Sequence, residues 1–137
     1  MQVAPGSKAL TLNSGGLPGC DSPEPTLTPT PTPGPPATIT VFKVYSDNTH
    51  AAVSVTLTCD SGTVSPPGTG SVGSAMSEPG SPPVFSVSAF DPGATCTATE
   101  EVPLGYSETD DCTGIAIAPG DAKSCTITNT LITPTPT

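Results

Sequence analysis

Apolar and polar residues alternate along short stretches of the chain between residues 37 and 132. A period of two residues is typical of strands that turn one face toward a core. No stretch of useful length repeats its apolar residues at helical spacing. The expected inward positions are Ile39, Val41, Lys43 and Tyr45; Val53, Val55, Leu57 and Cys59; Phe85, Val87 and Ala89; Cys96, Ala98 and Glu100; Ile115 and Ile117; and Cys125, Ile127, Asn129 and Leu131.

Turn-forming residues separate these stretches. The Asp-Pro-Gly at residues 91–93 and the Pro-Gly-Asp at residues 119–121 are strong turn signals. Residues 60–83 are rich in Gly, Ser and Pro, so we expect mostly loop there, with a weak strand at residues 71–76. Short strands between turns predict an all-β domain, a small sandwich of two sheets, over residues 37–132.

Segments of a different composition flank this domain. Residues 1–22 form an N-terminal extension, and residues 23–36 alternate Thr with Pro, which favours an extended and semi-rigid linker. Residues 133–137 begin a second spacer of the same kind. The linker threonines are candidates for O-glycosylation, with an unmodified linker as the alternative. They are Thr26, Thr28, Thr30 and Thr32, and the extension holds one short strand-like stretch, Lys8, Ala9, Leu10, Thr11, Leu12 and Asn13.

The charge of the chain excludes several classes of partner. Twelve acidic residues face only three Lys+Arg, which gives a formal net charge of -9. Nucleic acids and anionic membranes require clustered basic residues, so we expect neither as a partner. No stretch is long and apolar enough to span a membrane. The residues after Met1 lack the pattern of a signal peptide, so a secreted protein would be represented here by its mature form or a fragment.

Five cysteines in 137 residues indicate an oxidising compartment, outside the cell or at its surface. Their scattered spacing and the single histidine argue against zinc. We expect disulfides among Cys59, Cys96, Cys112 and Cys125. The pairs Cys59–Cys96 and Cys112–Cys125 are plausible, but four cysteines allow three connectivities and the sequence does not choose. Cys20 is left over, either as a free thiol or as an intermolecular disulfide to another subunit.

Three polar residues occupy inward positions of the predicted strands. They are Lys43 on the first strand, Glu100 in the middle and Asn129 on the last. Burying an ammonium and a carboxylate separately is expensive, so we expect these groups to meet. Glu101 is adjacent to Glu100, and a shift of one residue in register would exchange the two carboxylates.

A resemblance to a known family follows from these positions. The segment at residues 98–106 (Ala-Thr-Glu-Glu-Val-Pro-Leu-Gly-Tyr), with Lys43 upstream and Cys-Thr-Ile-Thr-Asn-Thr at residues 125–130 downstream, resembles the prealbumin-like, or collagen-adhesin B-type, repeats of bacterial surface proteins and pilins. The resemblance implies an Ig-like or transthyretin-like sandwich. It also implies an internal isopeptide bond between Lys43 and Asn129, promoted by Glu100. Such a bond forms once per molecule, so the protein would not be an enzyme.

Other chemistry is weakly indicated. Glu108, Asp110 and Asp111 could bind calcium weakly, but a solvated acidic turn is the more ordinary interpretation. No catalytic constellation surrounds the serines or His50, and we expect no metal and no cofactor.

Two functional hypotheses remain open. The first is an extracellular structural or adhesive module, a subunit or tandem repeat of a surface fibre, pilus or stalk. Residues 8–13 could then pair with a sheet edge of a neighbouring subunit. The alternative is a secreted module that binds a carbohydrate, or another host or surface ligand, and is tethered by the Thr/Pro linker. A sugar site needs exposed aromatic rings, and the chain offers only Phe42, Tyr45, Phe85, Phe90 and Tyr106.

Overall fold

A computed structural model of the chain describes residues 23–30, 32–48 and 51–137. The chain divides into two units, Met1–Pro31 and Thr32–Thr137. In the first unit, residues 23–30 are exposed and form no regular secondary structure. The second unit contains the folded domain.

The described residues form nine strands and no helix. This part of the chain therefore contains no helix that could cross a membrane. The strands lie in two sheets, so the predicted all-β sandwich is confirmed. They are β1 (Ala37–Tyr45), β2 (Val53–Cys59), β3 (Thr63–Ser65), β4 (Val72–Ser77), β5 (Val84–Ser88), β6 (Ala94–Glu100), β7 (Tyr106–Asp110), β8 (Ile115–Ile117) and β9 (Ala122–Leu131).

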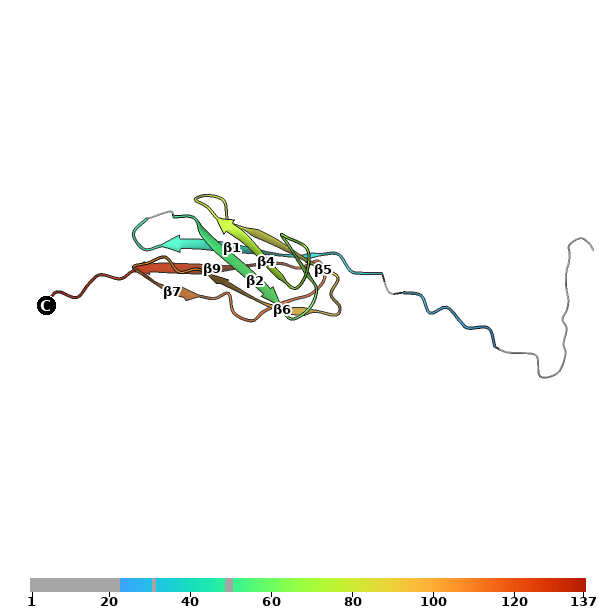
Figure 1. The fold of residues 1–137 in the computed structure, drawn as a ribbon. Helices are drawn as coiled ribbons and strands as arrows, with labels where there is room; N and C mark the ends of the chain where they lie inside the picture. Colours follow the sequence, from blue (N-terminus) through green and yellow to red (C-terminus); the bar gives the residue numbers. More distant parts are fainter. Residues whose placement is uncertain (1–22, 31, 49–50) are drawn as a thin grey trace, which may run out of the picture. The chain divides into compact units, whose positions relative to one another are not determined.

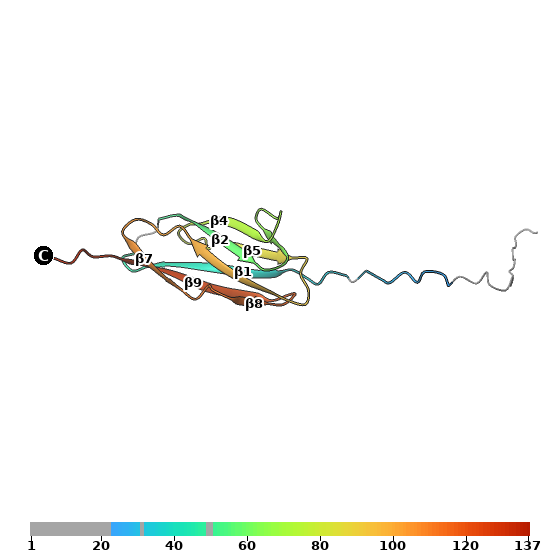
Figure 2. The ribbon, with the colours of Figure 1, turned by 60° about the horizontal axis from the view of Figure 1, so that its bottom comes forward.

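The two sheets have the orders β3-β5-β1-β9-β7 and β4-β2-β6-β8. Figures 1 and 2 show β1 and β9 side by side. The pair formed by β1 and β9 is parallel, and the other pairs within the described sheets are antiparallel. Since the first and last strands run side by side in the same direction, the chain enters the sandwich at one end and leaves it at the other. Ala37 and Leu131 therefore lie at opposite ends of the five-stranded sheet.

The core lies between the sheets and is formed by the inward positions of the alternating stretches. Ile39, Leu57, Phe85 and Ile127 are fully buried, and each such side chain contributes roughly 1.5–3 kcal/mol by burial. Thr and Ser occupy most of the outward positions, as in β6, where Thr95, Thr97 and Thr99 alternate with buried residues. The alternation thus predicts both faces of the central strands correctly.

The ends of two stretches differ from the expectation. Ala89 is exposed with a φ of 58°, because β5 ends at Ser88 and the chain turns there. Leu131 is 42% exposed, because it is the last residue of β9 and lies beyond the covered part of the sheet. Alternation identifies the face of a residue but does not show where the opposite sheet ends.

Two segments predicted as loop or turn contain strands. Residues 60–83 include β3 as well as β4, which lies within one residue of the predicted weak strand at 71–76. The acidic residues Glu108 and Asp110 belong to β7, which pairs with β9 over its whole length. In both cases pairing with a neighbouring strand outweighs the local preference of Gly, Ser and acidic residues for turns.

Gly73 allows β4 to pack closely against the chain that follows β3. A Cβ atom at this position would collide with the Pro66 carbonyl oxygen and the Val64 Cγ1 atom. The neighbouring Ser74 N–H donates a hydrogen bond of 3.1 Å to the same carbonyl oxygen. The close approach therefore depends on the absence of a side chain at Gly73.

We predict that Gly73→Ala lowers the free energy of unfolding by about 1–3 kcal/mol, the usual cost of an overpacked buried site. Gly70→Ala is the matched control, because a Cβ atom there meets nothing within 4 Å. The control should change stability by less than about 0.5 kcal/mol. Urea unfolding followed by circular dichroism measures both, and equal effects of the two substitutions would contradict the role given to Gly73.

Candidate functional site

Lys43, Glu100 and Asn129 lie in the interior of the sandwich and come from three strands. Lys43 is on β1 and Asn129 on β9, in the five-stranded sheet, whereas Glu100 ends β6 in the opposite sheet. The Lys43 Nζ atom is 2.9 Å from Glu100 Oε2, and these side chains are 7% and 0% exposed. Asn129 is fully buried as well. The lysine and the carboxylate therefore meet across the sandwich, as their inward positions predict.

The register of β1 and β9 brings Asn129 close to Lys43. β1 and β9 pair so that Tyr45 is opposite Asn129, and Lys43 is two residues before Tyr45 on the same face. Lys43 and Asn129 are thus diagonal neighbours in the sheet, a separation that long side chains can bridge. The alternative carboxylate, Glu101, is exposed, and its N–H donates to the Ser54 carbonyl oxygen. The register therefore selects Glu100 as the buried carboxylate.

The polar atoms of this cluster lack hydrogen bonds. Among the described residues, Lys43 Nζ, both carboxylate oxygens of Glu100, and Nδ2 and Oδ1 of Asn129 are buried without a hydrogen-bond partner. Lys43 and Glu100 are in ion-pair contact, but their approach does not have the geometry of a hydrogen bond. Unpaired buried polar atoms are rare because each one costs about 1–3 kcal/mol. Such a concentration of them at one point calls for a chemical explanation.

Two tyrosines lie beside the cluster. Lys43 Nζ is 4.7 Å from the centre of the Tyr45 ring, and the Tyr106 ring meets Tyr45 edge-on at 5.4 Å between centres. The Tyr45 hydroxyl donates to the Ala51 carbonyl oxygen at 3.0 Å, and the Tyr106 hydroxyl donates to Asp47 Oδ2 at 2.8 Å. Burial raises the pKa of Tyr45, and the Asn129 side chain beside its hydroxyl group lowers it, although the two groups do not have the geometry of a hydrogen bond. The rings help to keep water away from the cluster.

Lys43 also borders a pocket of about 360 Å³ at the surface. Phe42, Tyr45, Ser77 and Pro82 contribute to its wall. Lys43 therefore contributes to the cluster through its buried amine and to the wall of this surface pocket.

Glu108 is a member of this neighbourhood that the sequence interpretation missed. It is half-buried on β7 and lies directly opposite Asn129 on β9. Burial raises the pKa of Glu108, as do the charges of Glu100 and Asp110, while Lys43 lowers it. The signal was present in the sequence, because Tyr106 and Glu108 alternate with Ser107 as they would in a strand. The acidic composition instead favoured a turn.

Two disulfides cross-link the domain. Cys59 and Cys96 are paired across β2 and β6, and Cys112 is joined to Cys125 on β9. Of the three connectivities that the sequence allowed, the structure contains the pairing that strand positions made plausible. Both bridges lie in the core, where all four cysteines are buried.

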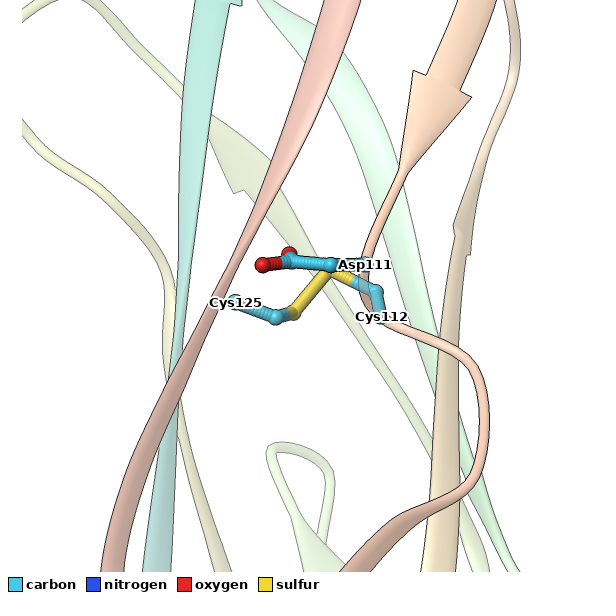
Figure 3. Close-up of side chains that lie close together, drawn as sticks. All are labelled: Asp111, Cys112 and Cys125. Atoms are coloured by element: carbon cyan, nitrogen blue, oxygen red, sulfur yellow. A yellow bond between two sulfur atoms is a disulfide. The ribbon is translucent and has the colours of Figure 1, made fainter.

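Asp111 is adjacent to the second disulfide but does not complete a metal site. Figure 3 shows its carboxylate beside the Cys112–Cys125 bridge. The two sulfur atoms are bonded to each other and are not thiolate ligands. Asp111 Oδ1 accepts a hydrogen bond from the Thr126 N–H at 2.6 Å, and Asp110 Oδ1 accepts one from the Cys112 N–H at 2.7 Å. These carboxylates therefore order the chain around the bridge.

Other predicted sites lie partly or wholly outside the described residues. Cys20 and the stretch Lys8–Asn13 fall within residues 1–22, which the structure does not describe. The linker threonines Thr26, Thr28, Thr30 and Thr32 are described and exposed, so they are accessible to modification. Of the aromatic residues considered for a sugar site, Tyr45, Phe85 and Phe90 are buried, whereas Phe42 is 45% exposed.

Comparison with known proteins gives matches among solved structures only. The chain matches no protein-family model and no curated protein. A pilus-presented adhesin (Cpa) matches with 8% identity and a TM-score of 0.47, over 70% of this chain and 27% of the adhesin. The major pilin protein (T-13) from Streptococcus pyogenes matches with 11% identity and a TM-score of 0.43, over 71% of this chain and 45% of the pilin. This chain thus spans less than half of either protein.

The raised pKa of Glu108 predicts a pH-dependent effect on stability. The folded protein holds the Glu108 proton more tightly than the unfolded chain, so the associated stability is present at acid pH and lost as the pH rises through the folded pKa. Glu108→Gln cannot ionise and should therefore raise the free energy of unfolding at neutral pH. The gain should vanish below the ordinary glutamate pKa of 4.5.

Urea unfolding at a series of pH values measures this effect. Glu101→Gln is the control, because it removes an exposed acidic group from the residue next to Glu100. A gain for Glu108→Gln that is the same at every pH, or a loss at neutral pH, would contradict the assignment.

Proposed function

We propose that the protein is an extracellular structural or adhesive module, a subunit or repeat of a surface fibre, pilus or stalk. Two disulfides and an internal isopeptide bond between Lys43 and Asn129 would reinforce it, with Glu100 promoting the bond. The observation that carries the proposal is the buried cluster in which the amine, carboxylate and amide lack hydrogen-bond partners. A covalent bond at this point removes the need to bury a charged amine.

The reaction requires only the groups of the cluster. A proton moves from the Lys43 ammonium to the Glu100 carboxylate, which lie 2.9 Å apart. The neutral amine attacks the Asn129 side-chain carbonyl carbon, and a new C–N bond forms. The Cγ–Nδ2 bond of Asn129 breaks, and a second proton from Nζ passes through Glu100 to the departing nitrogen. The products are an amide, ammonia and a protonated Glu100, so atoms and charge balance.

Burial favours this chemistry in two ways. Keeping an ammonium and a carboxylate charged in the interior carries a desolvation cost, and the reaction removes both charges. The product also gives buried polar atoms of the cluster hydrogen-bond partners, because a protonated Glu100 can donate to the new amide carbonyl.

The topology suits a module that carries load along a fibre. Tension on the two ends of the domain pulls β1 and β9 in opposite directions, because they are parallel neighbours with ends at opposite poles. A bond from Lys43 to Asn129 would join these two strands directly. The segments closed by the disulfides, between Cys59 and Cys96 and between Cys112 and Cys125, lie within the chain between the bonded residues. They would therefore be shielded from the load.

We predict that the intact mass of the folded, fully reduced protein is lower than the sequence mass by one ammonia. Reduction is needed because each disulfide also lowers the mass. Lys43→Arg should restore the full mass, because a guanidinium retains the charge but is a poor nucleophile. Glu100→Gln should also abolish or strongly slow the loss, because an amide cannot relay the proton.

Lys123→Arg is the matched control for the lysine substitution, since Lys123 is an exposed lysine on β9. It should keep the mass deficit, and fragmentation of the cross-linked peptide should place the bond between Lys43 and Asn129. A wild-type mass equal to that of the plain sequence would overturn the proposed bond. Circular dichroism of each variant shows whether the sandwich has formed.

Assembly is the second part of the proposal, and the flanking segments support it. Thr/Pro spacers stand on both sides of the domain, an arrangement suited to a bead in a longer string. The described linker threonines are exposed and could carry O-linked glycans. Cys20 would form an intermolecular disulfide, and residues Lys8–Asn13 would add a strand to a neighbouring subunit.

We predict that the full chain forms assemblies whose size falls when Cys20 is replaced by Ser or when residues 1–22 are deleted. Size-exclusion chromatography with light scattering, with and without reductant, separates the two contributions. The disulfide contribution should respond to reductant, whereas strand addition should not. A monomer under every condition would refute self-association of this segment without affecting the isopeptide proposal.

A further inference from the structure

Four strands lie at the edges of the two sheets, and they differ in the backbone groups that they leave unpaired. They are β3 and β7 in one sheet and β4 and β8 in the other. The loop after β3 closes two of these edges. It provides the Gly68 N–H and the Gly70 carbonyl as partners for Val64 on β3, and the Pro66 carbonyl as a partner for the Ser74 N–H on β4. β8 has only three residues, so these three edges offer little to another strand.

β7 is different, because its outer side is open. The Asp111 N–H donates to the Thr126 carbonyl across the β7–β9 pair. Hydrogen-bonded pairs alternate in an antiparallel ladder, so Ser107 and Thr109 also bond to β9. The residues between and beside them, such as Glu108, therefore direct their N–H and carbonyl groups away from the sheet.

The open side of β7 is a vacant strand position. Among the described residues, the N–H and carbonyl groups of Glu108 and Asp110 that face outward have no backbone partner. Tyr106 adds its carbonyl, since its N–H donates to the Pro103 carbonyl. An edge of this kind is a template for pairing with another chain. A strand of the length of Lys8–Asn13 supplies the complementary row of groups.

We propose that the outer side of β7 is the acceptor site for the Lys8–Asn13 segment of a neighbouring copy of this chain, which adds there as a strand antiparallel to β7. This inference rests on the proposed function, in which that segment adds a strand to a neighbouring subunit. It names the edge that receives the segment, the direction of pairing and the charges that select it.

Charge complementarity favours this occupant. β7 carries Glu108 and Asp110, so pairing with the β7 strand of another copy is opposed by repulsion between carboxylates. The chain has three basic residues. Lys43 is buried in the cluster, and Lys123 already lies beside a carboxylate on the turn before β9. The third is Lys8, at the start of the strand-like segment.

The direction and register follow from the same residues. Antiparallel addition places Lys8 at the acidic end of β7, opposite Asp110. Leu12 then falls opposite Tyr106, and Leu10 lies between them. Paired residues turn their side chains to the same face, so both leucines lie on the half-buried side of the edge. A shift of one residue would turn both leucines toward the solvent.

The topology gives this direction a consequence for assembly. β1 and β9 point toward the C-terminal end of the domain, and β7 points the other way (Figure 1). A strand antiparallel to β7 therefore runs with β9, and the chain of the donor leaves the acceptor at the end where β9 stops. The donor's own sandwich begins at its opposite end, with β1. All copies then point the same way, and the contact extends into an open fibre.

The test measures assembly of the full chain in a Cys20→Ser background, which removes the intermolecular disulfide. Glu108→Pro deletes an outward N–H and leaves the β7–β9 ladder intact. We expect it to raise the concentration for half-assembly roughly tenfold or more, as light scattering reports. Met76→Pro on β4 is the matched control. Met76 is two residues after Ser74, so its N–H also faces outward, and assembly should be unchanged.

A charge cycle keeps the test decisive if circular dichroism shows that Glu108→Pro does not fold. Lys8→Gln should weaken assembly about twofold to fivefold at low salt, and Lys123→Gln should not. Asp110→Asn removes the charge but keeps the oxygen that accepts from the Cys112 N–H, and it should weaken assembly equally. The double variant should be no weaker than either single one. Fully additive effects would overturn the pairing of Lys8 with Asp110.

Amide hydrogen exchange, quenched and read by nuclear magnetic resonance, locates the added strand. The Glu108 and Asp110 amides should be protected in assemblies and should lose that protection in the full-length Leu10→Pro variant. The Ser107 and Thr109 amides should stay protected in both, because they bond to β9. Unprotected Glu108 and Asp110 amides in wild-type assemblies would overturn the inference.

The remaining outcomes separate this inference from the proposed function. Assembly that survives Glu108→Pro but is lost in Leu10→Pro would overturn the β7 site while strand addition stands. Loss in Met76→Pro alone would assign the strand to β4 instead. A monomer with a protected Glu108 amide would show pairing within one chain, and a monomer without that protection would remove strand addition altogether. The bond between Lys43 and Asn129 is read separately, by mass.

Discussion

The contact between Lys43 and Glu100 is the interaction on which the interior of this domain depends. Both side chains are almost completely buried, and desolvating each ion costs several kcal/mol. A small sandwich with few aromatic residues has little stability to spare for that cost. Removing one partner alone would leave an unpaired charge, which typically costs about 3–5 kcal/mol. Conversion of the pair into an amide and a neutral acid, as proposed, would remove both buried charges and their desolvation cost.

The cross-links and the strand order belong together. The first and last strands are central and parallel, whereas the disulfides join interior segments of the chain. A disulfide lowers the conformational entropy of the unfolded chain, which stabilises the folded state by about 3–4 kcal/mol for loops of these lengths. The two kinds of staple would therefore serve different purposes. The disulfides stabilise a small core against unfolding, and a bond between β1 and β9 would carry tension.

The outer faces of the sheets interact with water mainly through hydroxyl groups, although only 11% of the residues are charged. Thr and Ser occupy most outward positions of the central strands, where their hydroxyl groups bind water and their shape suits a pleated surface. The edge strand β7 carries acidic side chains, which discourage unwanted pairing with another sheet. Glu108 is the exception on that strand, because it is half-buried and lies opposite Asn129.

The sequence by itself determined which face of each central strand is buried. A two-residue period is a local property that does not depend on the partner strands, so alternation alone places Lys43, Glu100 and Asn129 inside. Only the tertiary structure decided what those residues meet, because strand order and register depend on pairing between distant segments. The same pairing buries Glu100 rather than Glu101 and places Cys59 beside Cys96, where they form a disulfide. It also leaves Leu131 exposed at the end of β9. It also placed Glu108 opposite Asn129, since acidic residues that locally favour a turn become a strand when β9 offers its edge.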